Sequence, residues 1–135
     1  GDQYDEYLSG YLERWKGQIV NVINRTELNE LPSILKGASL HIGSDSGLLH
    51  IAGVVGTPTV CIVGGSDPSL FGWHKVHSKH RIVQHELACH PCYRWYLPNR
   101  NRVEHASKCP DFKCITSIST NEVFNNISAQ LKQDD

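Results

Sequence analysis

Apolar residues in this chain fall into short runs whose spacing changes along the sequence, and the changes predict a mixed α/β fold. Residues 4–15 place aromatic and leucine side chains at intervals of three and four, which is typical of an amphipathic helix. The run at 19–23 predicts a short buried strand. A second helix is predicted from Thr26, or from Pro32 because proline is accepted in a first helical turn, and Gly37 ends it.

Three more apolar runs, at 40–43, 59–63 and 81–84, predict further strands. A helix beginning at Ser46 separates the first two of these runs. Strand and helix therefore alternate over residues 19–63, which predicts parallel strands joined by right-handed crossovers. A capping box, Ser119 with Glu122, predicts the start of a last helix with an apolar face formed by Val123, Phe124, Ile127 and Leu131.

The turn at residues 45–50, Asp-Ser-Gly-Leu-Leu-His, joins the predicted strand 40–43 to the following helix. Asp45 or Ser46 can cap the helix, and Gly47 lets a ligand approach the backbone. The first N–H groups of a helix lack partners and carry partial positive charge, so they suit an anion such as a phosphate. The same residues also fit an ordinary helix start, and His50 equally fits an ordinary helix histidine.

The composition describes one globular domain without a membrane span. The chain has 135 residues, of which 39% are hydrophobic and 20% charged, and its formal net charge is −1. That charge gives no support to broad attraction toward nucleic acid or anionic lipid. No apolar run approaches the roughly 20 residues that cross a bilayer.

Five cysteines, an odd number, argue against a simple disulfide framework. Cys89, Cys92, Cys109 and Cys114 gather in an irregular excursion at about residues 86–116. Two close thiolate pairs can form a tetrahedral site for structural zinc or iron. Two disulfides and four free thiols remain alternatives, and His90 or His105 could replace a cysteine ligand. We expect a reducing compartment, the cytoplasm, for this chain.

The other candidate residues have ordinary interpretations. Cys61 lies inside an apolar strand and is expected in the core. Trp73 is interpreted as a loop anchor, although it could stack on a base or sugar. A redox function for the Cys89–Cys92 pair is disfavoured because a redox pair prefers a strand-to-helix turn. The remaining histidines are interpreted as solvated loop residues: His74, His77, His80 and His85.

Residues 26–72 resemble the C-terminal, donor-binding domain of glycosyltransferase family 9, the ADP-heptose:lipopolysaccharide heptosyltransferases. The resemblance lies in four blocks that follow one another in the family's order, at residues 31–38, 45–52, 55–60 and 64–68. The capping-box helix near the end of the chain also fits the closing helix of that domain.

The resemblance implies a fold of two Rossmann-like domains that face a cleft, the GT-B arrangement. This chain would be the C-terminal half, truncated at its N-terminus, with residues 1–135 forming one partial nucleotide-sugar-binding domain. The acceptor-binding domain, which supplies the general base, would be missing, so the catalytic residues stay unknown. We expect the isolated chain not to catalyse transfer.

The resemblance also implies partners and binding residues. The donor would be a nucleotide-diphosphate sugar, ADP-heptose, and the acceptor a lipopolysaccharide core or a protein; transfer would need no metal. Such a bacterial enzyme is expected in the cytoplasm or peripherally at the inner face of the inner membrane. The donor-binding residues carried over from the family are Asp45, Ser46, Gly47, Leu48, His50 and Gly65.

The cysteine spacing resembles the metal-binding finger of bacterial autotransporter heptosyltransferases, a branch of the family that modifies protein. In that branch four cysteines hold an iron, which implies the same role here for Cys89, Cys92, Cys109 and Cys114. A rival hypothesis makes this four-cysteine element a protein-interaction or homo-oligomerisation module on an α/β scaffold. Nucleic-acid binding is disfavoured by the net charge of −1.

Overall fold

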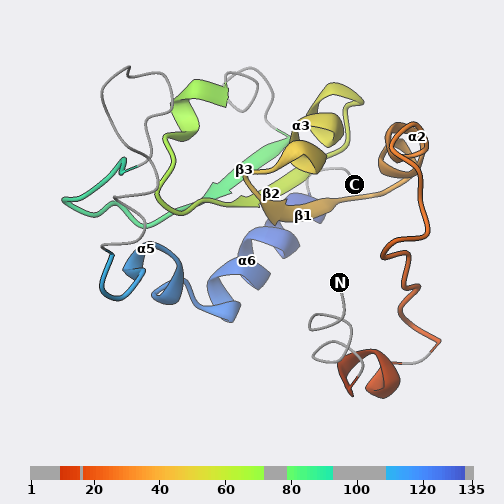
Figure 1. The fold of residues 1–135 in the computed structure, drawn as a ribbon, viewed down its shortest axis with the longest axis horizontal. Helices are drawn as coiled ribbons and strands as arrows, with labels where there is room; N and C mark the ends of the chain where they lie inside the picture. Colours follow the sequence, from red (N-terminus) through yellow and green to blue (C-terminus); the bar gives the residue numbers. More distant parts are fainter. Residues whose placement is uncertain (1–9, 16, 72–78, 93–108, 133–135) are drawn as a thin grey trace. The chain divides into compact units, whose positions relative to one another are not determined.

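The computed structural model describes residues 10–15, 17–71, 79–92 and 109–132. The chain divides into two compact units, Gly1–Glu30 and Leu31–Asp135. The larger unit is built on a three-stranded parallel sheet whose strands are adjacent in chain order (Figure 1). The strands are β1 (His41–Ser44), β2 (Thr59–Ile62) and β3 (His80–Val83).

The register of the sheet brings the carboxyl ends of all three strands to one edge. Ser44 of β1 pairs with Ile62 of β2, and Ile62 pairs in turn with Val83 of β3. The loops that leave these strands therefore start side by side. In open parallel sheets this edge is where ligands bind.

Helices cover both faces of the sheet (Figure 1). On one face α3 (Gly47–Val54) packs on β1 and β2 and is flanked by α2 (Leu31–Lys36). On the other face α6 (Thr120–Leu131) packs on β2 and β3. Two short helices lie on loops, η1 (Pro68–Phe71) and α5 (Lys113–Thr116). The described part of the chain contains no helix of the length and apolarity that a bilayer crossing needs.

The core forms around the central strand β2, which is covered on both faces. Leu49 of α3 packs with Cys61 and Val63, and Ile82 of β3 lies against them. These side chains are removed from water, which is the main favourable contribution to the stability of such a sheet. The arrangement confirms the predicted Rossmann-like α/β fold class and the core position of Cys61.

The predicted elements of the α/β unit are confirmed with boundaries shifted by about one residue. The helix α3 ends just before Gly56, which adopts φ +82°, a conformation that costs glycine little. There the N–H of Thr57 donates to the carbonyl of Ala52 at 3.0 Å and closes the helix end.

Two helices near the start of the chain have bounds that differ from the predicted ones. Of the predicted helix 4–15, residues 10–14 are helical, and residues 4–9 lie outside the described residues. The next helix, α2, begins at Leu31, which corresponds to the Pro32 start rather than the Thr26 start. Proline suits this first turn because its missing N–H needs no partner there.

The predicted strand at 19–23 is wrong. No strand covers these residues in the described part of the unit Gly1–Glu30, and their apolar side chains are exposed, Val20 at 85%. A short apolar run becomes a strand only when a neighbouring strand satisfies its backbone groups. That unit offers no such strand among its described residues.

The predicted apolar face of α6 is also wrong in part. Phe124 and Leu131 are exposed, at 63% and 44%, whereas Gln130 is buried. Gln130 is accepted inside because its side-chain oxygen receives a hydrogen bond from the Arg81 Nε–H at 3.0 Å. The face of α6 that packs on the sheet therefore includes a polar residue, Gln130, whose side chain is hydrogen-bonded.

Candidate functional site

The turn after β1 leaves the start of α3 open. Ser46 precedes the helix in an extended conformation, and its side chain makes no capping hydrogen bond. A Cβ atom built on Gly47, the first helical residue, would meet no atom of the described residues within 4 Å beyond its chain neighbours and its own helix. Without a cap from Ser46, the first N–H groups of α3 keep the hydrogen-bonding capacity that an anion-binding helix start requires.

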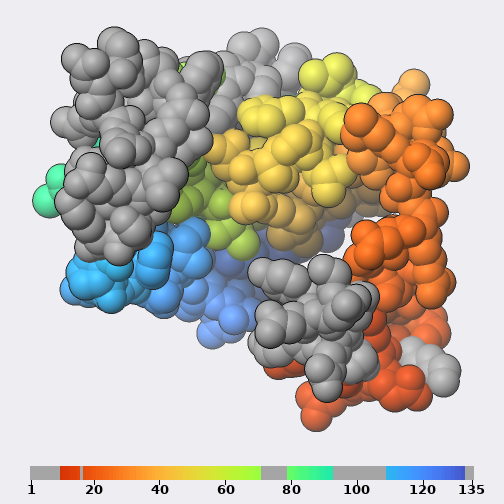
Figure 2. Space-filling view, in the orientation of Figure 1, coloured from red at the N-terminus to blue at the C-terminus, as the bar shows by residue number. Residues whose placement is uncertain are grey.

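Asp45 and His50 meet across this turn. Nε2 of His50 lies 3.4 Å from Oδ1 of Asp45. The His50 side chain is 45% exposed and the Asp45 side chain 25%. Leu48 lies between them in the sequence and is also exposed, at 41%. Figure 2 shows α3, in yellow, at the surface of the larger unit. Asp45, Leu48 and His50 thus lie together at accessible surface, whereas Leu49 is buried in the core.

The loop after β2 is crowded, in contrast. A side chain on Gly65 would overlap Sγ of Cys92, and one on Gly64 would lie 3.1 Å from Cδ1 of Ile115. Gly65 was predicted to bind the donor. In the structure its missing side chain makes room for a residue of the cysteine segment.

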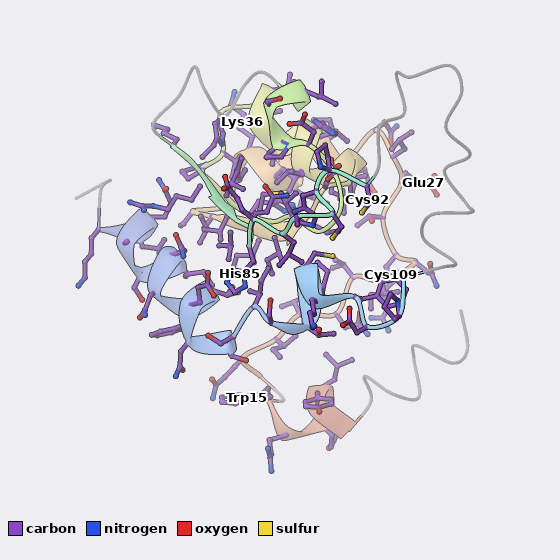
Figure 3. All side chains as sticks on the ribbon, turned by 90° about the vertical axis from the view of Figure 1, so that its left-hand side faces the viewer. Trp15, Glu27, Lys36, His85, Cys92 and Cys109 are labelled. Atoms are coloured by element: carbon purple, nitrogen blue, oxygen red, sulfur yellow. The ribbon has the colours of Figure 1, made fainter. Side chains whose placement is uncertain are left out.

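Two of the four clustered cysteines, Cys92 and Cys114, contact this loop. Cys92 Sγ lies 3.7 Å from the carbonyl oxygen of Gly65, and Cys114 is buried beside Gly64. Burial raises the pKa of the Cys114 thiol, and the neighbouring Cys92, Cys109 and Cys89 raise it further. In Figure 3 Cys92 lies near the strand ends and Cys109 lies on the segment that leads to α5.

The cysteines are free thiols in this structure. Within the described ranges, no group of three or more His, Cys, Asp or Glu side chains is arranged to hold a metal ion. The structure thus places Cys89, Cys92 and Cys109 in the neighbourhood of Cys114 without assembling a coordination site within the described ranges.

Cys61 is chemically distinct from these four. It lies within β2, and burial together with the nearby Asp45 carboxylate raises the pKa of its thiol to about 12. Such a thiol stays protonated and inert at neutral pH.

Two histidines that were interpreted as solvated loop residues have structural partners, so that interpretation is wrong for them. Nδ1 of His85 lies 2.8 Å from the Ser117 hydroxyl, and Nε2 lies 3.0 Å from a carboxylate oxygen of Glu122. His80 lies on β3, 3.0 Å from the hydroxyl of Thr59. As Figure 3 indicates, His85 links the end of the sheet to the start of α6.

Sequence reasoning missed Gln84, which bridges two strand ends. Its side-chain N–H groups donate to the carbonyls of Gly64 and Ser66 at 3.0 and 3.1 Å. A glutamine as the last residue of a predicted strand was the available signal, but its partners follow another strand and are distant in sequence. Trp73, His74, His77 and His105 lie outside the described residues.

The comparisons with known proteins identify the family of the chain. A family model described as glycosyltransferase family 9 (heptosyltransferase) matches residues 3–101. Lipopolysaccharide heptosyltransferase 1 of Salmonella typhimurium is 34% identical over 53 residues, a match that covers 39% of this chain. The match covers only 17% of that relative's length. No solved structure matches the chain.

Proposed function

This chain belongs to glycosyltransferase family 9, and on that premise we propose that its turn between β1 and α3 binds the diphosphate of a nucleotide-sugar donor. The donor we propose is ADP-heptose, and the acceptor is a lipopolysaccharide core or a protein. The name of the Salmonella relative supports heptose as the sugar and lipopolysaccharide as the acceptor. We also propose that the whole enzyme transfers heptose from this donor to that acceptor.

The observation that carries the proposal is the open start of α3. The Ser46 side chain does not cap the helix, and the space beside Gly47 is empty. The first helical N–H groups therefore keep their hydrogen-bonding capacity and their partial positive charge. A diphosphate oxygen placed there would receive charge-assisted hydrogen bonds from the backbone.

The same contacts would assist sugar transfer. In the proposed reaction an acceptor hydroxyl loses its proton to a base outside this chain and attacks the anomeric carbon of the donor. The bond from that carbon to the diphosphate breaks, and ADP leaves with the bonding electrons. Negative charge grows on the departing phosphate, so N–H groups already aimed at it stabilise the transition state more than the ground state.

Asp45 and His50 would shape this site rather than bind phosphate directly. A lone carboxylate beside a diphosphate is unfavourable, and the approach of His50 Nε2 to within 3.4 Å of Asp45 reduces that repulsion when the imidazole is protonated. Asp45 is therefore proposed to hold the turn and face the sugar side of the donor.

Calorimetric titration with ADP, ADP-heptose and UDP-glucose tests this proposal, using the chain and its Gly47→Val variant. The Cβ of the new side chain would meet no described atom within 4 Å beyond its neighbours and its own helix, and the branched side chain would occupy the space proposed for the ligand, so we expect ADP affinity to fall by about tenfold or more. Val54→Ala, at the opposite end of α3 and 87% exposed, is the control and should bind like the parent chain. Unchanged ADP affinity in Gly47→Val would refute the phosphate site.

We also propose that Cys89, Cys92, Cys109 and Cys114 hold a structural zinc or iron ion. Soft thiolates suit such an ion, and Cys92, Cys109 and Cys89 lie near enough to Cys114 to raise the pKa of its thiol. Their present positions form no group of three ligands within the described ranges, so binding would have to draw them together. Cobalt titration tests this: thiolate charge-transfer bands should appear for the parent chain and for Cys61→Ser, but weaken in Cys92→Ser. Equal bands in all three would exclude this site.

A further inference from the structure

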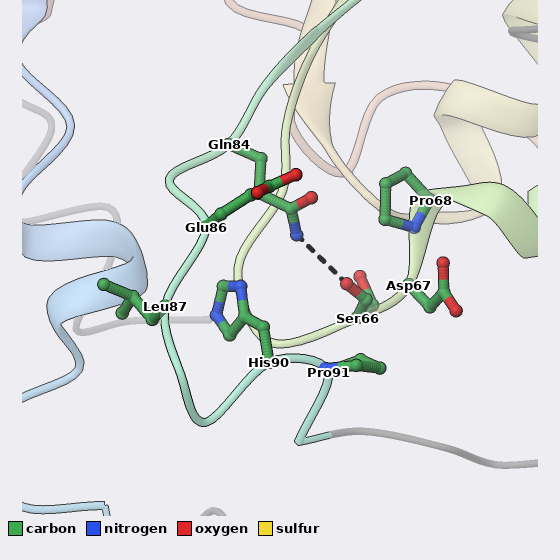
Figure 4. Close-up of a pocket in the computed structure, with 8 residues that line it drawn as sticks. All are labelled: Ser66, Asp67, Pro68, Gln84, Glu86, Leu87, His90 and Pro91. Carbon is green, nitrogen blue, oxygen red and sulfur yellow. Dashed lines mark hydrogen bonds between the residues drawn. The ribbon is translucent and has the colours of Figure 1, made fainter.

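The loop after β2, residues 64–67, borders open space on one side. A pocket of about 240 Å³ lies between this loop and the segment after β3, whose lining residues include Gln84 and His90 (Figure 4). The loop therefore lacks close packing on its pocket side. It also begins with two consecutive glycines, Gly64 and Gly65, and glycine loses more conformational freedom on ordering than any other residue. Packing alone does not account for a single conformation of this loop.

Hydrogen bonds from the segment after β3 restrain the loop. The side-chain N–H groups of Gln84 donate to the carbonyls of Gly64 and Ser66 at 3.0 and 3.1 Å. Figure 4 draws the bond to Ser66. The carbonyl oxygen of Gly65, between these two residues, lies 3.7 Å from the thiol of Cys92. Three consecutive carbonyls of the loop thus face side chains of the segment after β3.

The direction of these carbonyls fixes the direction of the N–H groups that follow them. Residues 64–67, all of which the structure describes, contain no cis peptide bond. In a planar trans peptide the C=O of one residue and the N–H of the next point in opposite directions. The N–H groups of Gly65, Ser66 and Asp67 therefore point away from Gln84 and Cys92. The two side chains set the orientation of these donors without touching them.

The open start of α3 lies at the same edge of the sheet. The register pairs Ser44 at the end of β1 with Ile62 at the end of β2, so the turn after β1 and the loop after β2 leave adjacent strands side by side. N–H groups from two neighbouring segments suit a diphosphate, because its two phosphate groups carry separate charges. A loop that is ordered before the ligand arrives spares binding the cost of ordering it.

We propose that Gln84 is a positioning residue of the donor site, which holds the loop after β2 so that the Gly65 N–H faces the diphosphate. This rests on the proposed function and adds to it a residue that acts through the loop. One planar amide with two N–H groups is suited to bridge the carbonyls of Gly64 and Ser66. A side chain without a donor would release both carbonyls and leave the loop peptides free to turn.

Amide NMR during an ADP titration tests this in the parent chain and in Gln84→Met, which keeps the side-chain length but donates no hydrogen bond. We expect ADP affinity to fall about five- to tenfold in the variant. At saturating ADP the Gly65 amide signal should move in the parent chain and stay in place in Gln84→Met, a result that lost stability alone does not produce. Asn125→Leu, an amide-to-apolar change at an exposed position of α6, is the control and should match the parent chain.

Gln84→Asn is the milder variant, and it carries the test if Gln84→Met does not fold. Its amide keeps both N–H groups but is one methylene shorter, so it does not reach both carbonyls at once. The ADP affinity and the Gly65 response should therefore lie between those of the parent chain and Gln84→Met. Parent-like ADP affinity, or an undiminished Gly65 response, in the variants that fold overturns the proposal.

The signals of Gly47 and Gly65 separate this proposal from the proposed function. If ADP moves Gly65 but not Gly47, and Gln84→Met abolishes that movement, the phosphate site at the turn is refuted and the positioning by Gln84 is supported. If ADP moves Gly47 but not Gly65, the positioning proposal is overturned and the phosphate site at the turn stands. If ADP moves neither signal, both are refuted.

Discussion

Two glycine-containing turns leave the sheet side by side, and they use glycine for different purposes. The register pairs Ser44 with Ile62, so the turn at Gly47 and the loop at Gly65 begin at one edge. The space beside Gly47 is empty, whereas the space beside Gly65 is taken by Cys92. One glycine leaves room for an outside molecule, and the other leaves room for the chain's own cysteine segment.

The starts of two helices show the same contrast. Ser119 caps α6 by accepting a hydrogen bond from the Glu122 N–H at 3.1 Å. Ser46 has the same position before α3 but forms no such bond. The start of α6 is thus capped by the side chain of its own serine, whereas the start of α3, to which we assign a ligand, is not.

The largest expected effect is a difference in thiol reactivity between Cys61, which is buried in β2, and Cys89, which is exposed. The pKa of about 12 for Cys61 lowers its thiolate fraction at neutral pH by about a thousandfold relative to an ordinary thiol. We expect iodoacetamide to label exposed Cys89 readily and to leave Cys61 unlabelled in the folded chain. Peptide mapping by mass spectrometry over a time course checks this. Equal labelling rates would contradict the buried position of Cys61.

Gly65→Ala tests the crowded loop. The added methyl group would overlap Cys92 Sγ, so we expect the free energy of unfolding to fall by about 1–3 kcal/mol. Urea denaturation measures the change. Gly47→Ala is the matched control and should stay within about 0.5 kcal/mol of the parent chain.

A second substitution separates this overlap from a general intolerance of the loop. In Gly65→Ala combined with Cys92→Ala, the overlapping sulfur is gone, and most of the lost stability should return relative to Cys92→Ala alone. No recovery would mean that another feature of the loop requires glycine.

Serine substitutions test the contrast between the helix starts. Ser119→Ala removes the cap of α6 and should lower the free energy of unfolding by about 1 kcal/mol. Ser46→Ala removes no capping bond and should change it by less than about 0.5 kcal/mol. Thermal and urea denaturation of both variants give the comparison. Equal losses would indicate that Ser46 also caps its helix in solution.

The smallest expected effect is a pH dependence from His41 on β1. Burial lowers the pKa of His41 from its ordinary value of 6.5, and its Nε2 has no partner within the described ranges. Below pH 6.5 the unfolded chain therefore binds a proton before the folded chain does, and stability falls as the pH falls. His41→Leu should show a shallower decline in urea midpoints between about pH 7 and pH 5. Parallel declines would contradict this.

The sequence predicted those parts of the fold whose signals are local. The strands β1 to β3 and the start of α3 follow from short-range hydrophobic patterns and from the turn residues at 45–47. The capping box of α6 was predicted for the same reason, because Ser119 and Glu122 are only three residues apart.

The errors concern residues whose environment depends on distant parts of the chain. Residues 19–23 have the composition of a strand but no partner strand among the described residues of their unit. Gln130 is buried because Arg81, far away in sequence, satisfies its side chain. His85 binds Glu122 and Ser117 in the same way. Hydrophobic periodicity contains no information about such pairings.

For the same reason, only part of the candidate site could be predicted from the sequence. The turn at 45–50 is contiguous, so its residues could be named from sequence. The pocket at His90 and Gln84 joins segments that follow different strands, and only the register brings them together. Gly65 was named from the family resemblance as a donor-binding residue, and its contact with Cys92 became visible only in the structure.

The most direct test of the open helix start is an amide NMR titration of the chain with ADP and with adenosine. We expect ADP to move the backbone signals of Gly47, Leu48 and Leu49, because their N–H groups would donate to the diphosphate. Adenosine, which lacks phosphate, should leave them in place, and neither ligand should move Thr120 or Asn121 at the capped start of α6. If ADP binds without moving the three signals at the start of α3, the diphosphate site lies elsewhere and the central claim is wrong.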